Sequence, residues 1–234
     1  MVKKSERHNV AAPVPGMAFL KLLKRNNNRN WFAAHKERFL AEQGQVEIFA
    51  DALLQALNTH DVIETPSGKK CLNRIYRDIR FSQDKTPYKT KWSGSYRRAG
   101  QQRRGGYYFQ IAPGNSFVAG GFWSPNPEDL KRIRDDIAFD AAPVRKITKS
   151  KSFVSMFGQL QGDQIKTTPK GFDAANEAID LLRYKQFLLI RRFTDKEALS
   201  ETFLKEADRS FACMRPFFDY MSGILATDTN GVPL

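Results

Sequence analysis

The amino-acid sequence predicts a single α+β domain in which a central, mainly antiparallel sheet is flanked by helices. Residues 17–58 have helical periodicity, the middle of the chain contains a β-hairpin signal, and most of the second half returns to helical patterns. The chain has 234 residues, of which 41% are hydrophobic, so it can bury one substantial core. We therefore expect one domain over residues 17–226, between a flexible lead-in (residues 1–16) and a flexible tail (residues 227–234).

Three consecutive amphipathic helices are expected over residues 17–58. The run from Asn26 to Asn28 breaks the first helix, and Asn28 or Asn30 can cap the second. One face of the second helix carries Phe32, His35 and Phe39. The third helix has the clearest spacing, with apolar residues at Val46, Phe49, Ala50, Leu53, Leu54 and Leu57. These apolar faces need a packing partner, which we expect to be a sheet.

The strands of that sheet are predicted in the middle of the chain and near residue 190. Residues 107–111 and 116–119 are rich in aromatic and β-branched side chains, and Pro113-Gly114-Asn115 between them is a turn signal. An antiparallel hairpin is therefore expected. Residues 92–96 indicate a preceding strand, and residues 187–193 indicate a buried strand later in the chain.

The second half of the chain is predicted to be mostly helical. A helix begins after Asn126, because Asn126 can cap it and Pro127 suits its first position. Residues 143–157 and 173–184 also have helical patterns, and so does the C-terminal segment, residues 196–225. Pro216 is expected to kink or divide this last helix.

Cysteine usage and hydropathy limit the compartment and the cofactors. Cys71 and Cys213 lack the spacing of a disulfide framework or a zinc site, and free thiols suit a reducing cytosol, so we expect a cytoplasmic protein. The three histidines are scattered, so we expect neither a metal site nor a cofactor. No apolar run reaches the roughly 20 residues of a membrane span, so no membrane partner is expected. The sequence leaves the oligomeric state open.

One window of the chain carries most of its net positive charge. Residues 69–104 contribute +10 of the formal net charge of +13, with Asp78 and Asp84 as their only acids. The basic residues of this window are Lys69, Lys70, Arg74, Arg77, Arg80, Lys85, Lys89, Lys91, Arg97, Arg98, Arg103 and Arg104. Like charges repel in a compact state, so a cluster this dense indicates an anionic partner.

The densest part of this window is the segment from Arg74 to Lys89. If residues 74–82 are extended, a period of two places Ile75, Arg77, Ile79 and Phe81 on one face. That face is mostly apolar and is expected to point toward the core. The opposite face carries Arg74, Tyr76, Asp78, Arg80 and Ser82. Pro87 ends any regular element here, because it forces Thr86 toward extended geometry.

This segment also resembles a known family. Residues 74–89 follow the pattern Arg-Ile-x-Arg-Asp-x-Arg-Phe-Ser-x-Asp-Lys-Thr-Pro-Tyr-Lys. This pattern looks like the signature of the DUF2461 family of conserved proteins of unknown function. Three further stretches agree with that family: residues 19–36, residues 106–121 and residues 123–134. The resemblance implies one α+β domain over residues 17–225. It implies no activity and supplies no catalytic residues.

The charge and the aromatic content together favour anion binding. Guanidinium groups match the geometry of phosphate, and aromatic rings can stack on bases. The expected partner is a phosphate-bearing small molecule or a nucleic acid. The ligand-binding residues predicted on this basis are Arg74, Arg77, Arg80, Lys85, Tyr88, Lys89 and Trp92.

Two alternatives remain open for the same segment. In an enzyme, Asp78 or Asp84 would act as a general base and Tyr88 or Lys85 as a proton donor, while the arginines hold an anionic substrate. In a purely structural role, Asp78 and Asp84 would pair with neighbouring cations and fix a loop to the sheet. The structural role requires most of these arginines to be paired internally, whereas a binding site requires several of them to converge on an open cavity.

Overall fold

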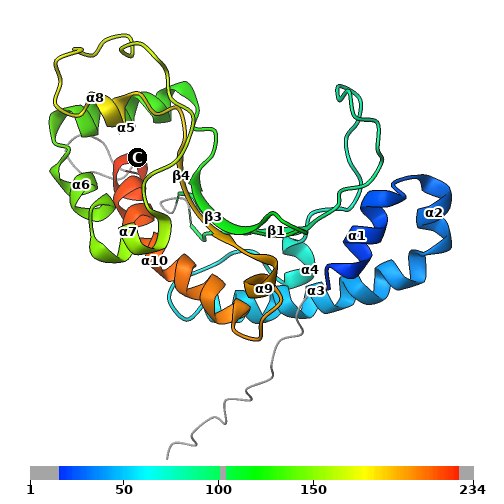
Figure 1. The fold of residues 1–234 in the computed structure, drawn as a ribbon. Coiled ribbons are helices and arrows are strands. Elements are labelled where there is room, and N and C mark those ends of the chain that lie inside the picture. Colours follow the sequence, from blue (N-terminus) through cyan, green and yellow to red (C-terminus); the bar gives the residue numbers. More distant parts are fainter. Residues whose placement is uncertain (1–15, 101–103, 227–234) are drawn as a thin grey trace, which may run out of the picture.

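The computed structural model describes residues 16–100 and 104–226, which form one α+β domain (Figure 1). The strands are β1 (Trp92–Arg97), β2 (Gly106–Ile111), β3 (Ser116–Phe122) and β4 (Phe187–Phe193). They form one antiparallel sheet in the order β1-β2-β3-β4. The predicted fold class and the predicted strands are therefore confirmed. The predicted lead-in, apart from Gly16, and the predicted tail lie outside the described residues.

The helices fall into three groups along the chain. Before the sheet come α1 (Ala18–Arg25), α2 (Arg29–Ala34), α3 (Lys36–Leu57) and α4 (Gly68–Cys71). Between β3 and β4 come α5 (Pro127–Phe139), α6 (Ala142–Thr148), α7 (Lys151–Phe157) and α8 (Ile179–Leu182). After β4 come α9 (Asp195–Ala198) and α10 (Phe203–Ala226).

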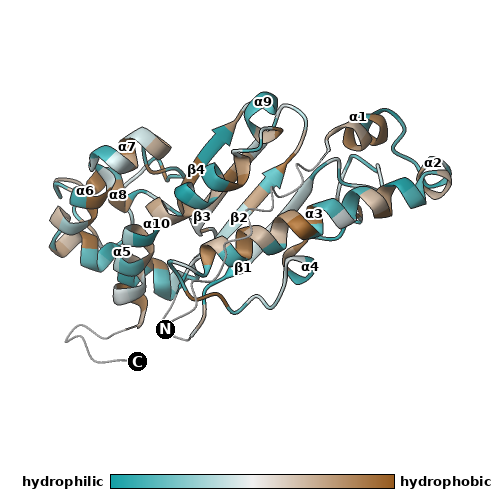
Figure 2. Ribbon diagram, turned by 90° about the horizontal axis from the view of Figure 1, so that it is seen from below, coloured by the Kyte–Doolittle hydropathy of each residue, from teal (hydrophilic) through white to brown (hydrophobic). Residues whose placement is uncertain are grey.

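Helices α3 and α10 cover one face of the sheet, where the main core lies (Figures 1 and 2). Phe49 of α3 packs edge to face on Phe109 of β2, with ring centroids 5.6 Å apart. Tyr107 of β2 contacts Phe211 and Phe218 of α10 at 4.9 and 5.1 Å. The opposite face of the sheet is left open between α1 and α2 at one end and α5 to α8 at the other (Figure 1).

The predicted helices of the first half are present, with one changed boundary. Asn28 caps α2 by accepting a hydrogen bond from the Trp31 amide at 2.9 Å. Phe39, expected on the second helix, belongs to α3, because the backbone leaves helical geometry at His35. Helix α4 was not predicted. It begins at Gly68, whose missing side chain lets it approach the backbone of α3: a Cβ there would lie 2.4 Å from the Asp51 nitrogen.

Three predictions for the second half were wrong in detail. The segment 143–157 forms two helices, because Ser150 caps α7 by accepting from the Phe153 amide. The segment 173–184 is helical only at Ile179–Leu182, since the side chains of Asp173 and Asn176 bond nearby backbone amides and compete with the helix. At Pro216 the expected division is wrong, because α10 runs through this residue, whereas the alternative of a kink stays a prediction.

Among residues 16–100 and 104–226, no helix combines the length and the apolar character that a membrane span requires.

Candidate functional site

The segment between α4 and β1 forms a long loop rather than a strand. It projects beside the open face of the sheet (Figure 1). Its two arms pair through the Arg77 amide and the Pro87 carbonyl at 2.9 Å. The Arg77 guanidinium contacts Asp84 Oδ2 at 2.5 Å, Ser82 Oγ at 3.3 Å and the Thr86 hydroxyl. Arg77 thus cross-links its own loop.

The other predicted cations lie along this loop. Arg80 pairs with Asp78 through Nη2 at 2.7 Å, and both side chains are exposed. Lys85 donates to the Ile79 carbonyl at 3.1 Å, and Lys89 donates to the Arg74 carbonyl at 2.9 Å. Two of the three predicted arginines therefore have carboxylate partners. The third, Arg74, is exposed, and its guanidinium bonds no described residue.

Two aromatic residues predicted to bind the ligand, Tyr88 of the loop and Trp92 of β1, are buried. Tyr88 is buried and stacks on Phe32 with ring centroids 4.0 Å apart. Trp92 is also buried, and its Nε1 donates to the Gly16 carbonyl at 3.3 Å. Both rings anchor the loop to the core. Phe81, expected to face the core, is 97% exposed, because the chain turns at residues 80 and 81 and the extended alternation ends there.

The Arg77–Asp84 pair gives a testable pH dependence. The Thr86 amide and the Arg77 guanidinium lower the pKa of Asp84 to about 2. Since the unfolded pKa is about 3.9, the pair stabilises the loop above that pH and is lost as the pH falls through about 2. NMR titration of the Asp84 carboxyl carbon should show this value. In Arg77→Met the pKa should rise only partly, because the Thr86 amide remains. A wild-type value near 3.9 would show that neither the Thr86 amide nor Arg77 bonds Asp84 in solution.

A large cavity lies on the open face of the sheet and has a volume of about 970 Å³. Its floor consists of small residues on β1, β2 and β3: Ser95, Gly106, Ala119 and Gly121. Lys70, Lys91 and Arg97 bring positive charge to its lining. Glu64 is the one acid among its described lining residues, and it pairs with Arg97 at 3.2 Å.

Two aromatic rings lie side by side in this cavity. Tyr108 of β2 and Phe117 of β3 have ring centroids 5.6 Å apart, at an interplanar angle of 39°. The Lys91 ammonium is 5.9 Å from the Tyr108 centroid, and the Arg192 guanidinium is 5.8 Å from the Phe117 centroid. We call Tyr108 and Phe117 the ring platform.

Polar contacts fix the orientation of Tyr108 and Lys91. Lys91 Nζ donates to Gln110 Oε1 at 2.7 Å and to Tyr108 Oη at 3.3 Å. The Tyr108 hydroxyl donates to the same Gln110 oxygen at 3.0 Å, and the Gln110 amide donates to the Asn115 carbonyl at 2.9 Å. In the described part of the chain no carboxylate pairs with Lys91, so its charge is available to an anion in the cavity.

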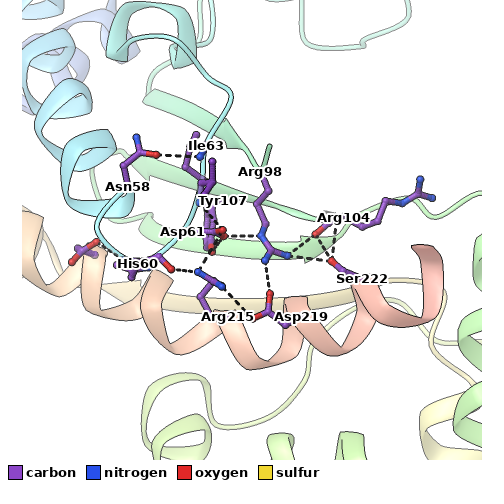
Figure 3. Close-up of polar contacts among 12 residues, drawn as sticks. Asn58, His60, Asp61, Ile63, Arg98, Arg104, Tyr107, Arg215, Asp219 and Ser222 are labelled. Carbon is purple, nitrogen blue, oxygen red and sulfur yellow. Dashed lines mark hydrogen bonds and ion pairs between the residues drawn. The ribbon is translucent and has the colours of Figure 1, made fainter. Parts of the chain in front are cut away.

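Arg98, also part of the basic window, is only 2% exposed and lies in the core (Figure 3). Its Nε donates to Asp61 Oδ2 at 2.7 Å, and its Nη2 donates to Asp219 Oδ1 at 2.5 Å. Its Nη1 donates to Ser222 Oγ and to the Arg104 carbonyl. This buried network ties the end of β1 to α10, and it is unavailable to a ligand.

The sequence contained a signal for the ring platform that the charge count obscured. Along β2, Tyr107, Phe109 and Ile111 are at most 1% exposed, whereas the alternating residues Tyr108 and Gln110 belong to the opposite face. Strand alternation therefore separates the core residues from the cavity residues. No pattern within the sequence indicates that the opposite face is left uncovered.

The fold and the cavity define an α+β protein whose antiparallel sheet carries a cation-lined aromatic cavity on its open face. The chain belongs to the family described as conserved hypothetical protein (DUF2461), whose model matches residues 16–220. No curated protein and no solved structure matches the chain. The expected family is confirmed.

Proposed function

We propose that the open face of the sheet binds a phosphate-bearing ligand that also contains a flat ring, as nucleotides and nucleic acids do. The ring platform carries this proposal, because two adjacent rings with cations beside them suit both parts of such a ligand. Stacking of a base on an aromatic side chain contributes about 1–3 kcal/mol. Lys91 adds a positive charge whose protein partners, Gln110 and Tyr108, are both neutral.

The size and the surroundings of the cavity support this proposal. Ligand cavities typically measure roughly 300–1,000 Å³, and this cavity lies near the upper end at about 970 Å³. Small floor residues leave room above the sheet for a flat ring. A cytoplasmic location, which we also propose, would expose the site to nucleotides and RNA.

The two aspartates fit a binding role better than an enzymatic one. Hydrogen bonds from Arg80 lower the pKa of Asp78, and hydrogen bonds from Thr86 and Arg77 lower the pKa of Asp84. A carboxylate with a depressed pKa is a weak general base near neutral pH. Both aspartates pair with arginines of their own loop, as the structural role of this segment requires, so the proposed binding site is the neighbouring cavity.

Substitution of the ring platform tests the proposal. We expect Tyr108→Leu and Phe117→Leu each to weaken binding of adenosine monophosphate by about tenfold, because each removes one stacking surface. Isothermal titration calorimetry measures this affinity, with inorganic phosphate as the probe that lacks a ring.

Phe139→Leu is the matched control, because Phe139 is 94% exposed on α5 and outside the cavity lining. Its affinity should equal that of the wild type. The proposal fails if the wild type does not bind the nucleotide. It also fails if the platform variants bind as tightly as Phe139→Leu.

A further inference from the structure

Two smaller cavities lie between the open face and the long loop that joins α4 to β1. The first has a volume of about 370 Å³ and shares Lys91, Gln110 and Phe117 with the large cavity. The second also has a volume of about 370 Å³ and shares Lys24, Thr90 and Lys91 with the first. The shared lining residues place the three cavities next to one another, and we call the three together the groove.

The far end of the groove is cationic, and Tyr88 is the one aromatic residue among its described lining residues. Its last cavity is lined by Lys24, Arg77, Lys89 and Lys91, with Asp84 as the one acid among its described lining residues. Asp84 is already paired with Arg77. Lys24, Lys89 and Lys91 have no carboxylate partner within residues 16–100 and 104–226. This end therefore suits phosphates, while the ring platform suits bases.

Neutral donors accompany the cations. Thr90 lines the same cavity, and hydroxyl groups commonly contact phosphate oxygens. Asn27 and Thr86 also line it, but the Asn27 amide bonds the Tyr88 backbone and the Thr86 hydroxyl bonds Arg77. Burial and the neighbouring charges of Lys91 and Arg74 lower the pKa of Lys89. An anion in this cavity would relieve that repulsion between cations.

We infer that the groove binds a single strand of nucleic acid, with bases on the ring platform and the backbone running past Lys91 and Lys24 to Lys89. This inference rests on the proposed function and makes it more specific. A mononucleotide would occupy only one end of the groove. A duplex cannot offer its bases to the rings on the sheet, because paired bases are stacked within the helix.

Binding of a length series tests the inference. The probes are thymidine monophosphate and labelled thymidine oligonucleotides of three, six and twelve residues, with matching uridine oligonucleotides. We expect affinity to rise with length until the groove is filled. Log K should fall with log salt concentration by roughly 0.7 per phosphate that the protein neutralises.

Two variants that each remove one positive charge test where the sugar-phosphate backbone of the nucleic acid lies. Lys24→Met and Lys89→Met should each weaken binding of the hexanucleotide severalfold and reduce its salt slope by about 0.7. Both variants should weaken binding of thymidine monophosphate less than binding of the hexanucleotide, because its single phosphate is placed at Lys91 beside the ring platform. Lys151→Met, an exposed lysine at the start of α7, is the matched control and should change neither affinity. Lys89 also donates a hydrogen bond to the Arg74 carbonyl, so its loss could destabilise the loop. The melting temperature of Lys89→Met, compared with that of the wild type, measures this effect.

The outcomes separate this inference from the proposed function. If the mononucleotide binds and affinity does not rise with length, the inference is overturned and the proposed function stands. A duplex that binds as tightly as the single strand also overturns it. If neither nucleotides nor oligonucleotides bind, both the inference and the proposed function fail.

Discussion

Asp61→Asn is expected to lower the free energy of unfolding by about 3–5 kcal/mol, because it leaves the buried Arg98 charge without its buried carboxylate partner. The Asp61 side chain has no exposed surface. It accepts hydrogen bonds from Arg98 Nε at 2.7 Å, from the Tyr107 hydroxyl at 2.8 Å and from the Val62 amide at 2.8 Å. Asparagine keeps the shape of the side chain but removes its charge.

After this change, two arginines would share one carboxylate. Arg98 and Arg215 both contact Asp219, whose side chain is about half exposed, and Arg215 also lies 3.4 Å from Asp61. Urea denaturation measures the loss. Asp135→Asn is the matched control, because the Lys131–Asp135 pair lies on the surface and such a pair contributes about 0–1 kcal/mol. Equal losses in the two variants would contradict a stabilising role for the buried network.

The effect of Asp61→Asn should also depend on pH. Burial alone would raise the pKa of Asp61, but hydrogen bonds from Tyr107, Val62 and Arg98 outweigh it, and the pKa lies below its ordinary value. A carboxyl with a lowered pKa stabilises the folded state above its unfolded pKa of about 3.9 and loses this contribution as the pH falls through the folded pKa. The difference between wild type and variant should therefore narrow below about pH 3.9.

Gly121→Ala is expected to lower the free energy of unfolding by about 2–4 kcal/mol. Gly121 lies in β3, opposite Gly106 of β2 and Leu188 of β4, with a φ of +138°. A Cβ at this position would lie 2.1 Å from the Phe187 carbonyl oxygen. Alanine therefore combines a strained backbone with a clash between paired strands.

Gly114→Ala separates these two costs. Gly114 has a φ of +71° in the β2–β3 turn, and an added Cβ there would have no atom within 4 Å. Only backbone strain remains, so we expect a loss of about 1 kcal/mol. Midpoints of urea unfolding compare the two variants. A loss at Gly121 no larger than the loss at Gly114 would show that the strands adjust to the extra carbon.

The elements of this fold could be predicted where the signal was local. The third helix was predicted from its apolar spacing, and Val46, Phe49 and Leu53 are indeed buried on α3. The hairpin was predicted from the turn at residues 113–115. Helix boundaries were predicted wrongly where side chains accept hydrogen bonds from nearby backbone amides. Asp173 and Asn176 do this before α8.

The functional role of the basic residues could not be predicted from charge alone. Arg98 and Lys91 belong to the same basic window, but Arg98 is buried among carboxylates and Lys91 lines an open cavity. Their partners, Asp61 and Asp219 for Arg98 and Gln110 for Lys91, come from other segments of the chain. The sequence places a residue on a face, but it does not reveal what lies opposite.

By itself, the sequence determined the α+β class, the strands, most of the helices and the family, because turns, caps and apolar periodicity act over a few residues. Only the tertiary structure decided which face of the sheet is covered by α3 and α10 and which is left open. It also decided which cations are neutralised by distant carboxylates. Both depend on contacts between residues far apart in the chain, and these contacts select the ring platform and the groove as the site to test.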